Sequence, residues 1–548
     1  MFRILSLLLL LVSFLSTESY AQDDRPVRVF IFAGQSNMVG SDSKVQDIAN
    51  FPPFVGLEKP QSDVRFSYSI GRDTKFKSEG WVDLQPVNNV VGPELSFARA
   101  VSKESESPIA IIKCAAGGTH LGGDWNPDLP EGFKMYPLTL ELIRTSLAEF
   151  DRQKIPYRIE GFMWHQGEND MFNETYMAEY GKNLMNFMAS WRRDLKSPEL
   201  KFYVGELCTK TIWGMDLRPR MHAISIGQKA ATLEDDNATY IPTSHHGVEI
   251  GGGVGLHYHY GTLGQLEHGV AYANAYLANI GKQKTSSRPL KSWPYLEKSK
   301  IKLFVMAGHR NMEGERAFRQ SVPASDLELL KNDPSIAFKY DLGGGARVSD
   351  GWEPLGQVGL FDTFGPELSF ASALKAEMPD ENIAIGKFTH SGSQMNDWTP
   401  AGSMATSRHI YPKFIEFIKQ SIRDLENRGH EVELAGIFYH VGENEMSMAS
   451  YRKSSSDWMR AMIESSRKDL GLPHLRWSLS QQLPTDHKSV NGIDVLAAFK
   501  ALADADKDVF HFPALDLPPQ KKQLVIDSPG IIWLGREIAK QYLGENLP

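Results

Sequence analysis

A serine in a glycine-containing turn is the first residue of this chain whose type and context could do chemistry. Ser36 lies in the segment Ala-Gly-Gln-Ser-Asn-Met, directly after the apolar run Val27–Gly34. A turn from a strand into a helix can expose the serine hydroxyl and aim nearby backbone N–H groups at one point. A serine hydroxyl is a weak nucleophile unless a base takes its proton. Ser36 is therefore a candidate nucleophile that needs a histidine from elsewhere in the chain.

The same segment occurs a second time, with the serine replaced. Residues 304–314 read Phe-Val-Met-Ala-Gly-His-Arg-Asn-Met-Glu-Gly, so Arg310 stands where the first copy has Ser36. Further motifs recur in the same order and with similar spacing: Gly92–Ala98 and Gly365–Ala371, Ile109–Lys113 and Ile383–Lys387, Asp124–Pro127 and Asp397–Pro400, His165–Asn169 and His440–Asn444. The period is far longer than a solenoid repeat, so each unit is a whole domain. We expect a hydrolase domain followed by a copy that has lost its chemistry.

The histidine that could act as the base precedes the last predicted helix of the first domain. This segment offers His257, His259 and His268. The two copies align here on their glycines, Gly264 with Gly530 and Gly269 with Gly535. His259 then falls opposite Val525, and His257 falls opposite Gln523. Loss of both histidines in the copy that lost the serine is what a nucleophile–base pair predicts.

Together, these motifs resemble those of the sialate O-acetylesterase and acetylxylan esterase group of carbohydrate esterases, which belongs to the SGNH-type hydrolases. The resemblance rests on three motifs in the right order, Gly34–Met38, Trp164–Glu168 and His259–Gln265. It covers nearly all of the first domain and, in weakened form, the second. It implies an α/β fold of two flavodoxin-like three-layer domains, no metal or other cofactor, and hydrolysis of acetyl groups from sugar hydroxyls.

The resemblance also implies roles for individual residues. Ser36 matches the nucleophile and His259 the general base, with His257 as the fallback base. Related enzymes often carry an aspartate three residues before this histidine, where this chain has Leu256. Glu168 is therefore the candidate for the third member of the triad, because a carboxylate fixes the imidazole tautomer and stabilises the imidazolium.

An oxyanion hole needs hydrogen-bond donors aimed at the tetrahedral intermediate, and each is worth ~3 kcal/mol of transition-state stabilisation. The candidates are the N–H of Ser36, the N–H of Gly117 or Gly118, and the side chain of Asn169. The side chain of Gln166 is an alternative donor.

Several of these residues also admit a purely structural interpretation. Ser36 could hold a helix N-terminus, and His259 could bond a carbonyl group. Glu168 is the weakest candidate, because the second copy keeps Glu443 and His440 without a nucleophile to serve. A zinc site is a further alternative, although no spacing of a third ligand supports it; its histidines would be His245, His246, His257 and His259.

The elements that must position these residues alternate between apolar strands and amphipathic helices. The pattern predicts strands at Val27–Gly34, Ile109–Cys114, Gly161–Trp164 and Phe202–Cys208, and helices at Pro93–Lys103, Leu138–Phe150, Met177–Leu195 and Leu263–Leu277. Unbroken apolar strands between helices indicate a parallel sheet that is covered on both faces. Ligands of such sheets bind beyond the carboxyl ends of the strands. Three loops with polar residues follow predicted strands and should meet there: Gly34–Met38, Ala115–Thr119 and His165–Asp170.

Length and composition suit two globular domains. The chain has 548 residues, of which 41% are hydrophobic and 23% are charged. Its net charge of −8 argues against a nucleic-acid partner. We expect a catalytic domain at residues 26–281, a polar linker at 282–300 and a degenerate, inactive domain at 301–546.

The N-terminus and the cysteines bear on where the protein resides. Arg3, the apolar run Leu5–Leu15 and the small residues before position 22 predict a signal peptide over residues 1–21, cut near Ala21. The run is too short to span a bilayer comfortably, so we expect an exported protein, periplasmic or extracellular. Cys114 and Cys208 could form a disulfide or remain two buried thiols.

The sequence thus favours an exported carbohydrate acetylesterase with a serine nucleophile and an acetylated carbohydrate substrate. Two other functions stay open: a glycan-binding protein without catalysis, and an esterase of non-sugar substrates. We expect the second domain to pack on the first or on a partner subunit, with binding of a carbohydrate as the alternative. The pocket-lining loops decide which sugar is the substrate, and their shape does not follow from residue types.

Overall fold

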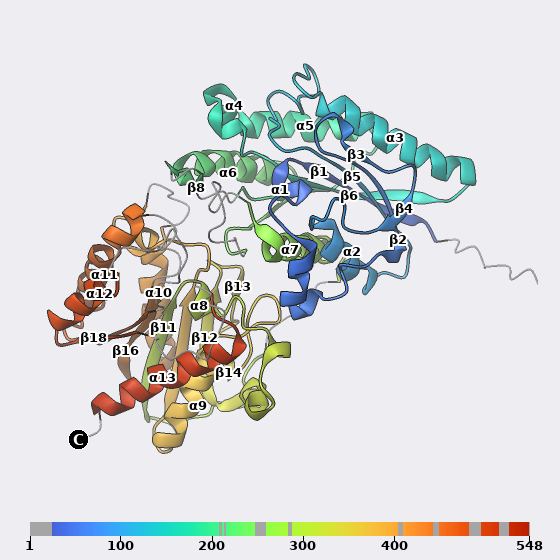
Figure 1. The fold of residues 1–548 in the computed structure, drawn as a ribbon. Coiled ribbons are helices and arrows are strands. Elements are labelled where there is room, and N and C mark those ends of the chain that lie inside the picture. Colours follow the sequence, from blue (N-terminus) through green and yellow to red (C-terminus); the bar gives the residue numbers. More distant parts are fainter. Residues whose placement is uncertain are drawn as a thin grey trace, which may run out of the picture.

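The chain folds into two α/β domains, each built on its own eight-stranded sheet (Figure 1). The computed structural model describes residues 25–207, 211–212, 215–246, 259–282, 288–403, 409–441, 449–481, 495–513 and 525–546. The predicted signal peptide lies outside these ranges. The predicted fold class is confirmed, and the sheets are mostly parallel with short antiparallel strands at one edge.

The sheet of the first domain has the strand order β10-β7-β6-β1-β5-β2-β3, and β4 pairs with β2. Its strands are β1 (Val27–Gly34), β2 (Gln61–Ile70), β3 (Phe76–Lys77), β4 (Val82–Leu84), β5 (Ile109–Ala115), β6 (Tyr157–His165), β7 (Phe202–Gly205) and β10 (Ala238–Ile241). The pairs β1–β5, β1–β6, β2–β5, β6–β7 and β7–β10 are parallel. A separate antiparallel pair is formed by β8 (Thr211–Ile212) and β9 (Met215–Asp216).

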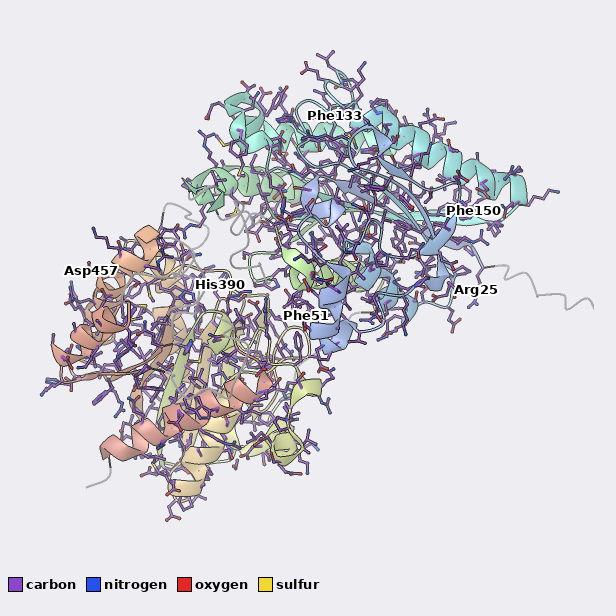
Figure 2. The ribbon with its side chains drawn as sticks, in the orientation of Figure 1. Arg25, Phe51, Phe133, Phe150, His390 and Asp457 are labelled. Carbon is purple, nitrogen blue, oxygen red and sulfur yellow. The ribbon has the colours of Figure 1, made fainter. Side chains whose placement is uncertain are left out.

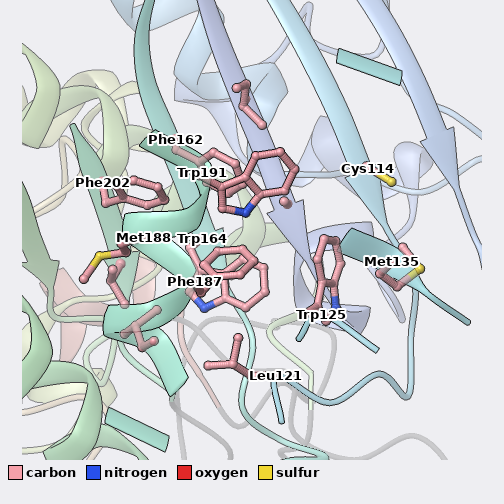
Figure 3. Close-up of a cluster of buried hydrophobic side chains, with 14 of the residues drawn as sticks. Cys114, Leu121, Trp125, Met135, Phe162, Trp164, Phe187, Met188, Trp191 and Phe202 are labelled. Atoms are coloured by element: carbon pink, nitrogen blue, oxygen red, sulfur yellow. The ribbon is translucent and has the colours of Figure 1, made fainter. Parts of the chain in front are cut away.

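Helices cover both faces of this sheet. Successive residues of the central strand point to opposite faces, so this strand contributes side chains to both cores. Val29 and Ile31 of β1 face one core (Figure 3), and Phe30 and Phe32 face the other. Helices α3 (Met135–Gln153), α5 (Tyr180–Asp194) and α6 (Arg218–Leu233) pack on the first core, and α2 (Glu94–Ser102) and α7 (Gly261–Asn279) pack on the second. The short helices are α1 (Ser36–Val39), α4 (Glu174–Ala178), η1 (Val45–Asn50), η2 (Pro52–Phe54), η3 (Arg72–Thr74) and η4 (Asp170–Phe172).

The second domain repeats this plan with the strand order β13-β12-β15-β11-β16-β17-β18, and β14 pairs with β12. Its strands are β11 (Lys300–Gly308), β12 (Asp333–Leu342), β13 (Arg347–Val348), β14 (Glu353–Leu355), β15 (Ile383–Thr389), β16 (Glu431–Val441), β17 (Trp477–Gln481) and β18 (Val509–Pro513). Its helices are α8 (Arg310–Glu313), α9 (Glu367–Glu377), α10 (Tyr411–Glu426), α11 (Ala449–Leu470), α12 (Val495–Asp504), α13 (Ser528–Asn546), η5 (Arg319–Ser321), η6 (Ala324–Leu330) and η7 (Met395–Trp398).

Part of the predicted linker packs against the second domain. Tyr295 is buried in the core of that domain, and its hydroxyl donates a hydrogen bond to the carbonyl of Ile383 at 2.5 Å. The Trp293 indole donates to His430 Nε2 at 2.7 Å. Aromatic side chains need a partner for their polar atoms when they are buried, and both find one here.

Of the two cysteines, Cys114 lies within the described residues. Cys114 is a free thiol that is fully buried in β5, and burial raises its pKa to about 12. It therefore acts as a small core residue. Cys208 lies outside the described residues. None of the described helices combines the length and the apolar composition needed to cross a membrane.

Candidate active site

Three strands of the first sheet end at the same level. Gly34, the last residue of β1, pairs with Ala115 of β5 on one side and with His165 of β6 on the other. The loops that follow these strands therefore start from neighbouring positions at the carboxyl edge, where open α/β sheets bind ligands. Gly34 has a φ of 153°, and a β-carbon there would lie 2.0 Å from the carbonyl oxygen of His165. Only glycine allows this close approach of the loops.

Ser36 lies at the start of α1 and is 7% exposed. The helix is a single turn, and it ends at Gly40, which has a left-handed φ of 100°. The N–H groups of Gly40 and Ser41 both bond the carbonyl oxygen of Ser36 at 3.0 Å. A β-carbon on Gly117 would lie 3.4 Å from Ser36 Cβ. The serine is thus held in a tight turn directly beside the paired glycines.

The predicted oxyanion donors lie around this turn. The N–H groups of Ser36 and Gly117 donate to no other group within the described ranges. The Asn169 side-chain oxygen accepts from Gln35 Nε2 at 3.4 Å, which leaves its Nδ2 as the donor for a ligand. Gly117 is held in turn by Arg72, whose Nε donates to the Gly117 carbonyl at 2.9 Å. Gly118 has a φ of 75°, and the Arg72 guanidinium fills the space that its side chain would take.

Gln166, the alternative donor, is buried and already bonded. Its Nε2 lies within hydrogen-bond distance of three acceptors: Gln35 Oε1 at 3.0 Å, the Thr119 carbonyl at 2.9 Å and Asp170 Oδ2 at 2.6 Å. Its Oε1 accepts from Tyr180 at 3.1 Å. An amide nitrogen has only two hydrogens, so these three acceptors leave none for an oxyanion. Gln166 instead ties the three loops together.

His259 lies directly before α7 and close to the serine turn. The backbone N–H of the next residue, Tyr260, donates to Asn37 Oδ1 at 3.2 Å. His259 Nδ1 is 2.7 Å from Asp42 Oδ2, and its side chain is 15% exposed. This hydrogen bond lowers the pKa of Asp42, which keeps its carboxylate charged. The fallback base, His257, lies outside the described residues.

The position of Glu168 differs from what a triad acid requires. Its Oε1 accepts from Asn37 Nδ2 at 2.5 Å and lies 3.8 Å from His165 Nε2. The group is fully buried, and burial raises its pKa. The carboxylate that contacts the Nδ1 of His259 is instead that of Asp42. Glu168 is linked to His259 indirectly, through Asn37 and Tyr260.

The histidines behind the site form a buried cluster. The rings of His165 and His268 have centroids 4.7 Å apart, and those of His246 and His268 are 5.7 Å apart. Burial lowers the pKa of all three, that of His165 to about 3. Within the described ranges, no group of three or more His, Cys, Asp and Glu residues is arranged to hold a metal ion.

These histidines predict that the protein loses stability as the pH falls. The pKa of His165 in the first domain and of His440 in the second is lowered by burial to about 3. In an unfolded chain these groups have a pKa of about 6.5. Above pH ~6.5 these histidines are neutral in both states and do not lower the free energy of unfolding. As the pH falls from there towards 3, the free energy of unfolding decreases by up to about 1.4 kcal/mol per pH unit per histidine. Burial shifts the pKa of Glu168 upwards, so this group opposes the trend.

The measurement is the melting temperature between pH 7.5 and pH 4.5. We expect it to fall steeply below pH 6.5, and less steeply in His440→Gln, which carries one buried histidine fewer. A melting temperature that stays constant over this range would contradict the assignment of these histidines as neutral, buried groups.

The second domain repeats part of this framework, with other residues in the places of Ser36 and His259. The N–H of Ile526 donates to Asn311 Oδ1 at 2.9 Å, as that of Tyr260 does to Asn37. This contact agrees with the alignment that sets Val525 opposite His259. Arg310, in the place of Ser36, is buried and paired with Glu315.

Sequence analysis did not single out Asp42, which contacts His259, or Arg72, which contacts Gly117. Neither lies in one of the recurring motifs, so the patterns did not select them. For Asp42 a signal was available: counted from the shared turn, the second copy has Arg316 in its place. A negatively charged side chain in one copy and a positively charged one in the other mark a position that changed together with Ser36.

Comparisons with known proteins identify the family of the chain. The sequence profile of the family described as "Carbohydrate esterase, sialic acid-specific acetylesterase" matches residues 26–278 and, a second time, residues 300–544. A probable carbohydrate esterase of Arabidopsis thaliana is 26% identical over 268 residues, which is 46% of this chain and 92% of that protein.

Among solved structures, NanS is 15% identical with a TM-score of 0.37, over 47% of this chain and 99% of that one. A carbohydrate acetylesterase from Xanthomonas citri is 17% identical with a TM-score of 0.34, over 48% of this chain and 58% of that one. The family profile, in contrast, accounts for both halves of the chain. The chain therefore belongs to the sialic acid-specific acetylesterase family of carbohydrate esterases.

Proposed function

We propose that the first domain hydrolyses O-acetyl esters on a carbohydrate through an acyl-enzyme on Ser36. The observation that carries the proposal is the juxtaposition of the serine turn, the paired glycines and His259 at one sheet edge, in a chain of a carbohydrate esterase family. The second copy of the family fold lacks the serine and the histidine. This contrast supports placing the chemistry in the first domain.

In the proposed mechanism, Ser36 Oγ attacks the acetyl carbonyl carbon while His259 Nε2 takes the hydroxyl proton. The negative oxygen of the tetrahedral intermediate accepts hydrogen bonds from the N–H groups of Ser36 and Gly117 and from Asn169 Nδ2. The intermediate collapses with cleavage of the bond to the sugar oxygen, which receives the proton from the imidazolium. Water, deprotonated by His259, then attacks the acyl carbon. The bond to Ser36 Oγ breaks, the imidazolium returns its proton to Ser36, and acetate leaves.

The substrate class is tested by acetate release from p-nitrophenyl acetate, O-acetylated sialic acid, acetylated xylan and acetylated pectin. We expect release from at least one acetylated carbohydrate. Release from the small ester alone would favour an esterase of non-sugar substrates. If no substrate releases acetate and the folded protein binds glycans, the glycan-binding alternative replaces this proposal.

We propose that the second domain, residues 301–546, is inactive and packs on the catalytic domain, residues 26–281. In support, Arg218 Nη1 of α6 lies 2.9 Å from Asp397 Oδ1 of η7, and both side chains are buried. Ser391 Oγ donates to the carbonyl of His245 at 2.5 Å. Figure 2 labels Phe51 where the domains meet, and its ring centroid is 6.2 Å from that of Phe318.

The pair Arg218–Asp397 offers a direct test of this packing. Removing one partner of a buried ion pair leaves an uncompensated charge and costs about 3–5 kcal/mol. We expect Arg218→Met to separate the unfolding of the two domains in calorimetry, with one transition at a lower temperature. The matched control is Arg220→Met on the same helix. It removes an exposed pair with Glu174, worth about 0–1 kcal/mol, and a hydrogen bond to the Met171 carbonyl, both within the first domain. Equal calorimetric traces for the two variants would argue against the packing role.

We also propose that the protein is exported and that its signal peptide is removed near Ala21. The apolar run Leu5–Leu15 after Arg3 and the small residues that follow it support this. N-terminal sequencing of the protein from the exported fraction should begin close to Gln22. A protein retained in the cytoplasm with Met1 in place would overturn this proposal.

A further inference from the structure

We infer that Asp42 is the carboxylate that orients His259, in the role that the sequence assigned to Glu168. The inference rests on the proposed function, because it concerns the base of that reaction. Asp42 lies six residues after the nucleophile, in the loop that follows α1. It acts on the substrate only through His259, so it is a positioning residue.

The first argument is the contact itself. Asp42 Oδ2 lies 2.7 Å from His259 Nδ1, at the distance of a hydrogen bond to a charged group. A carboxylate on Nδ1 keeps the proton there, so that Nε2 is the unprotonated nitrogen that accepts the proton of the nucleophile. It also stabilises the imidazolium that forms during the attack.

The second argument is that the loop holds Asp42 in a fixed and unusual conformation. Asp42 has a φ of 62°, in the left-handed region that aspartate tolerates better than most residues. The next residue, Ser43, accepts through its Oγ from the N–H of Val91 at 2.7 Å. The residue after it, Lys44, donates its N–H to Thr262 Oγ1 at 2.8 Å. Thr262 lies three residues after His259, so this bond fixes the loop to the same helix start that carries the base.

The third argument is that Asp42 changed in the second domain together with the reacting groups. Gly40 and Gly314 occupy the same place, each ending a one-turn helix in a left-handed conformation. Two residues further on, Asp42 corresponds to Arg316. The inactive copy has thus replaced Ser36, His259 and Asp42, whereas it has kept Glu443 in the place of Glu168.

This pattern separates the two carboxylates. A residue that serves only the reaction loses its purpose when the nucleophile is gone, and Asp42 behaves in this way. Glu168 is fully buried and bonds Asn37, whose amide oxygen in turn holds the backbone of Tyr260. Asn311 repeats the second of these contacts in the inactive domain. Glu168 therefore belongs to the shared framework, and Asp42 belongs to the chemistry.

The test compares Asp42→Asn with wild type in acetate release. Asparagine fits the same space but carries no charge. Asp42 is 69% exposed, so we expect a loss of kcat on the order of a hundredfold, less than the ~10⁴ known for a buried triad aspartate. KM should change less than threefold, and the acidic limb of the kcat/KM profile should move to lower pH. Asp42→Glu should recover part of the lost kcat.

A matched control exists in the second domain, where Asp508 Oδ2 lies 3.0 Å from Nδ1 of the exposed His474. Asp508→Asn removes the same type of contact and should leave kcat unchanged. An Asp42→Asn enzyme with wild-type kcat and an unmoved pH profile would overturn the inference, as would a larger kcat loss in Glu168→Gln than in Asp42→Asn. Ser36→Ala, measured alongside, keeps the two proposals apart: if it stays active the proposed mechanism fails, and if it is inactive while Asp42→Asn is not, the role of Asp42 alone fails.

Discussion

Replacement of Ser36 by alanine should abolish acetate release, with a loss of kcat of about 10⁶-fold at constant folding stability. Alanine removes only the hydroxyl, and without it no acyl-enzyme can form. Ser36 is 7% exposed in a turn that its backbone carbonyl holds together, so the turn should survive the change. The residual rate should come from the donors at Gly117 and Asn169, which can still polarise a bound ester.

The measurement is kcat for the best acetylated substrate, with circular dichroism melts to verify folding. The control is Ser62→Ala, an exposed serine of β2, which should keep wild-type activity and stability. A Ser36→Ala enzyme with more than one hundredth of the wild-type kcat, free of wild-type contamination, would contradict the assignment of the nucleophile.

Replacement of His259 by alanine should have an effect of the same size, about 10⁴- to 10⁶-fold on kcat. In a serine hydrolase the base and the nucleophile act as a unit, and their losses do not add. The double variant Ser36→Ala with His259→Ala should therefore be no slower than the slower of the two single variants. If the two residues acted independently, the fold loss of kcat in the double variant would equal the product of the two single losses.

A matched histidine serves as the control for this variant. His474 in the second domain also bonds an aspartate through Nδ1, but it lies on an exposed surface. His474→Ala should leave kcat unchanged. If His259→Ala keeps most of its activity while a variant of His257 does not, the fallback base takes over the role assigned to His259.

The central strands and their helices could be predicted from the sequence because their patterns are local. The strand at Val27–Gly34 has the predicted bounds, and the helix predicted at Leu263–Leu277 is found as α7, two residues longer at each end. The helix predicted at Met177–Leu195 is interrupted at Glu179, between α4 and α5. Helix α6 was not predicted; it starts at Arg218, a polar residue that is buried through its ion pair with Asp397 of the second domain.

The site was predictable to the extent that its residues lie in recurring motifs. Ser36, Gly117 and Asn169 follow strands that end in register, and a parallel sheet brings such residues to one edge. The contact between Asp42 and His259 spans 217 residues. A local sequence pattern cannot predict a contact between residues so far apart in the chain. This contact depends on how the loop after α1 folds back onto the start of α7. For the third member of the triad, the sequence favoured Glu168 because it lies in a recurring motif. Recurring motifs also contain residues that both domains need for their fold, so a motif alone does not identify a catalytic role.

The most direct test of the account is mass spectrometry of the protein after reaction with a fluorophosphonate, which phosphonylates activated serines. We predict one adduct per chain, located on Ser36, with loss of acetate release in proportion to labelling. Labelling should be absent in Ser36→Ala and strongly slowed in His259→Ala. An active enzyme that remains unlabelled, or that carries its adduct on a serine of the second domain, would contradict the claim that Ser36 of the first domain is the nucleophile.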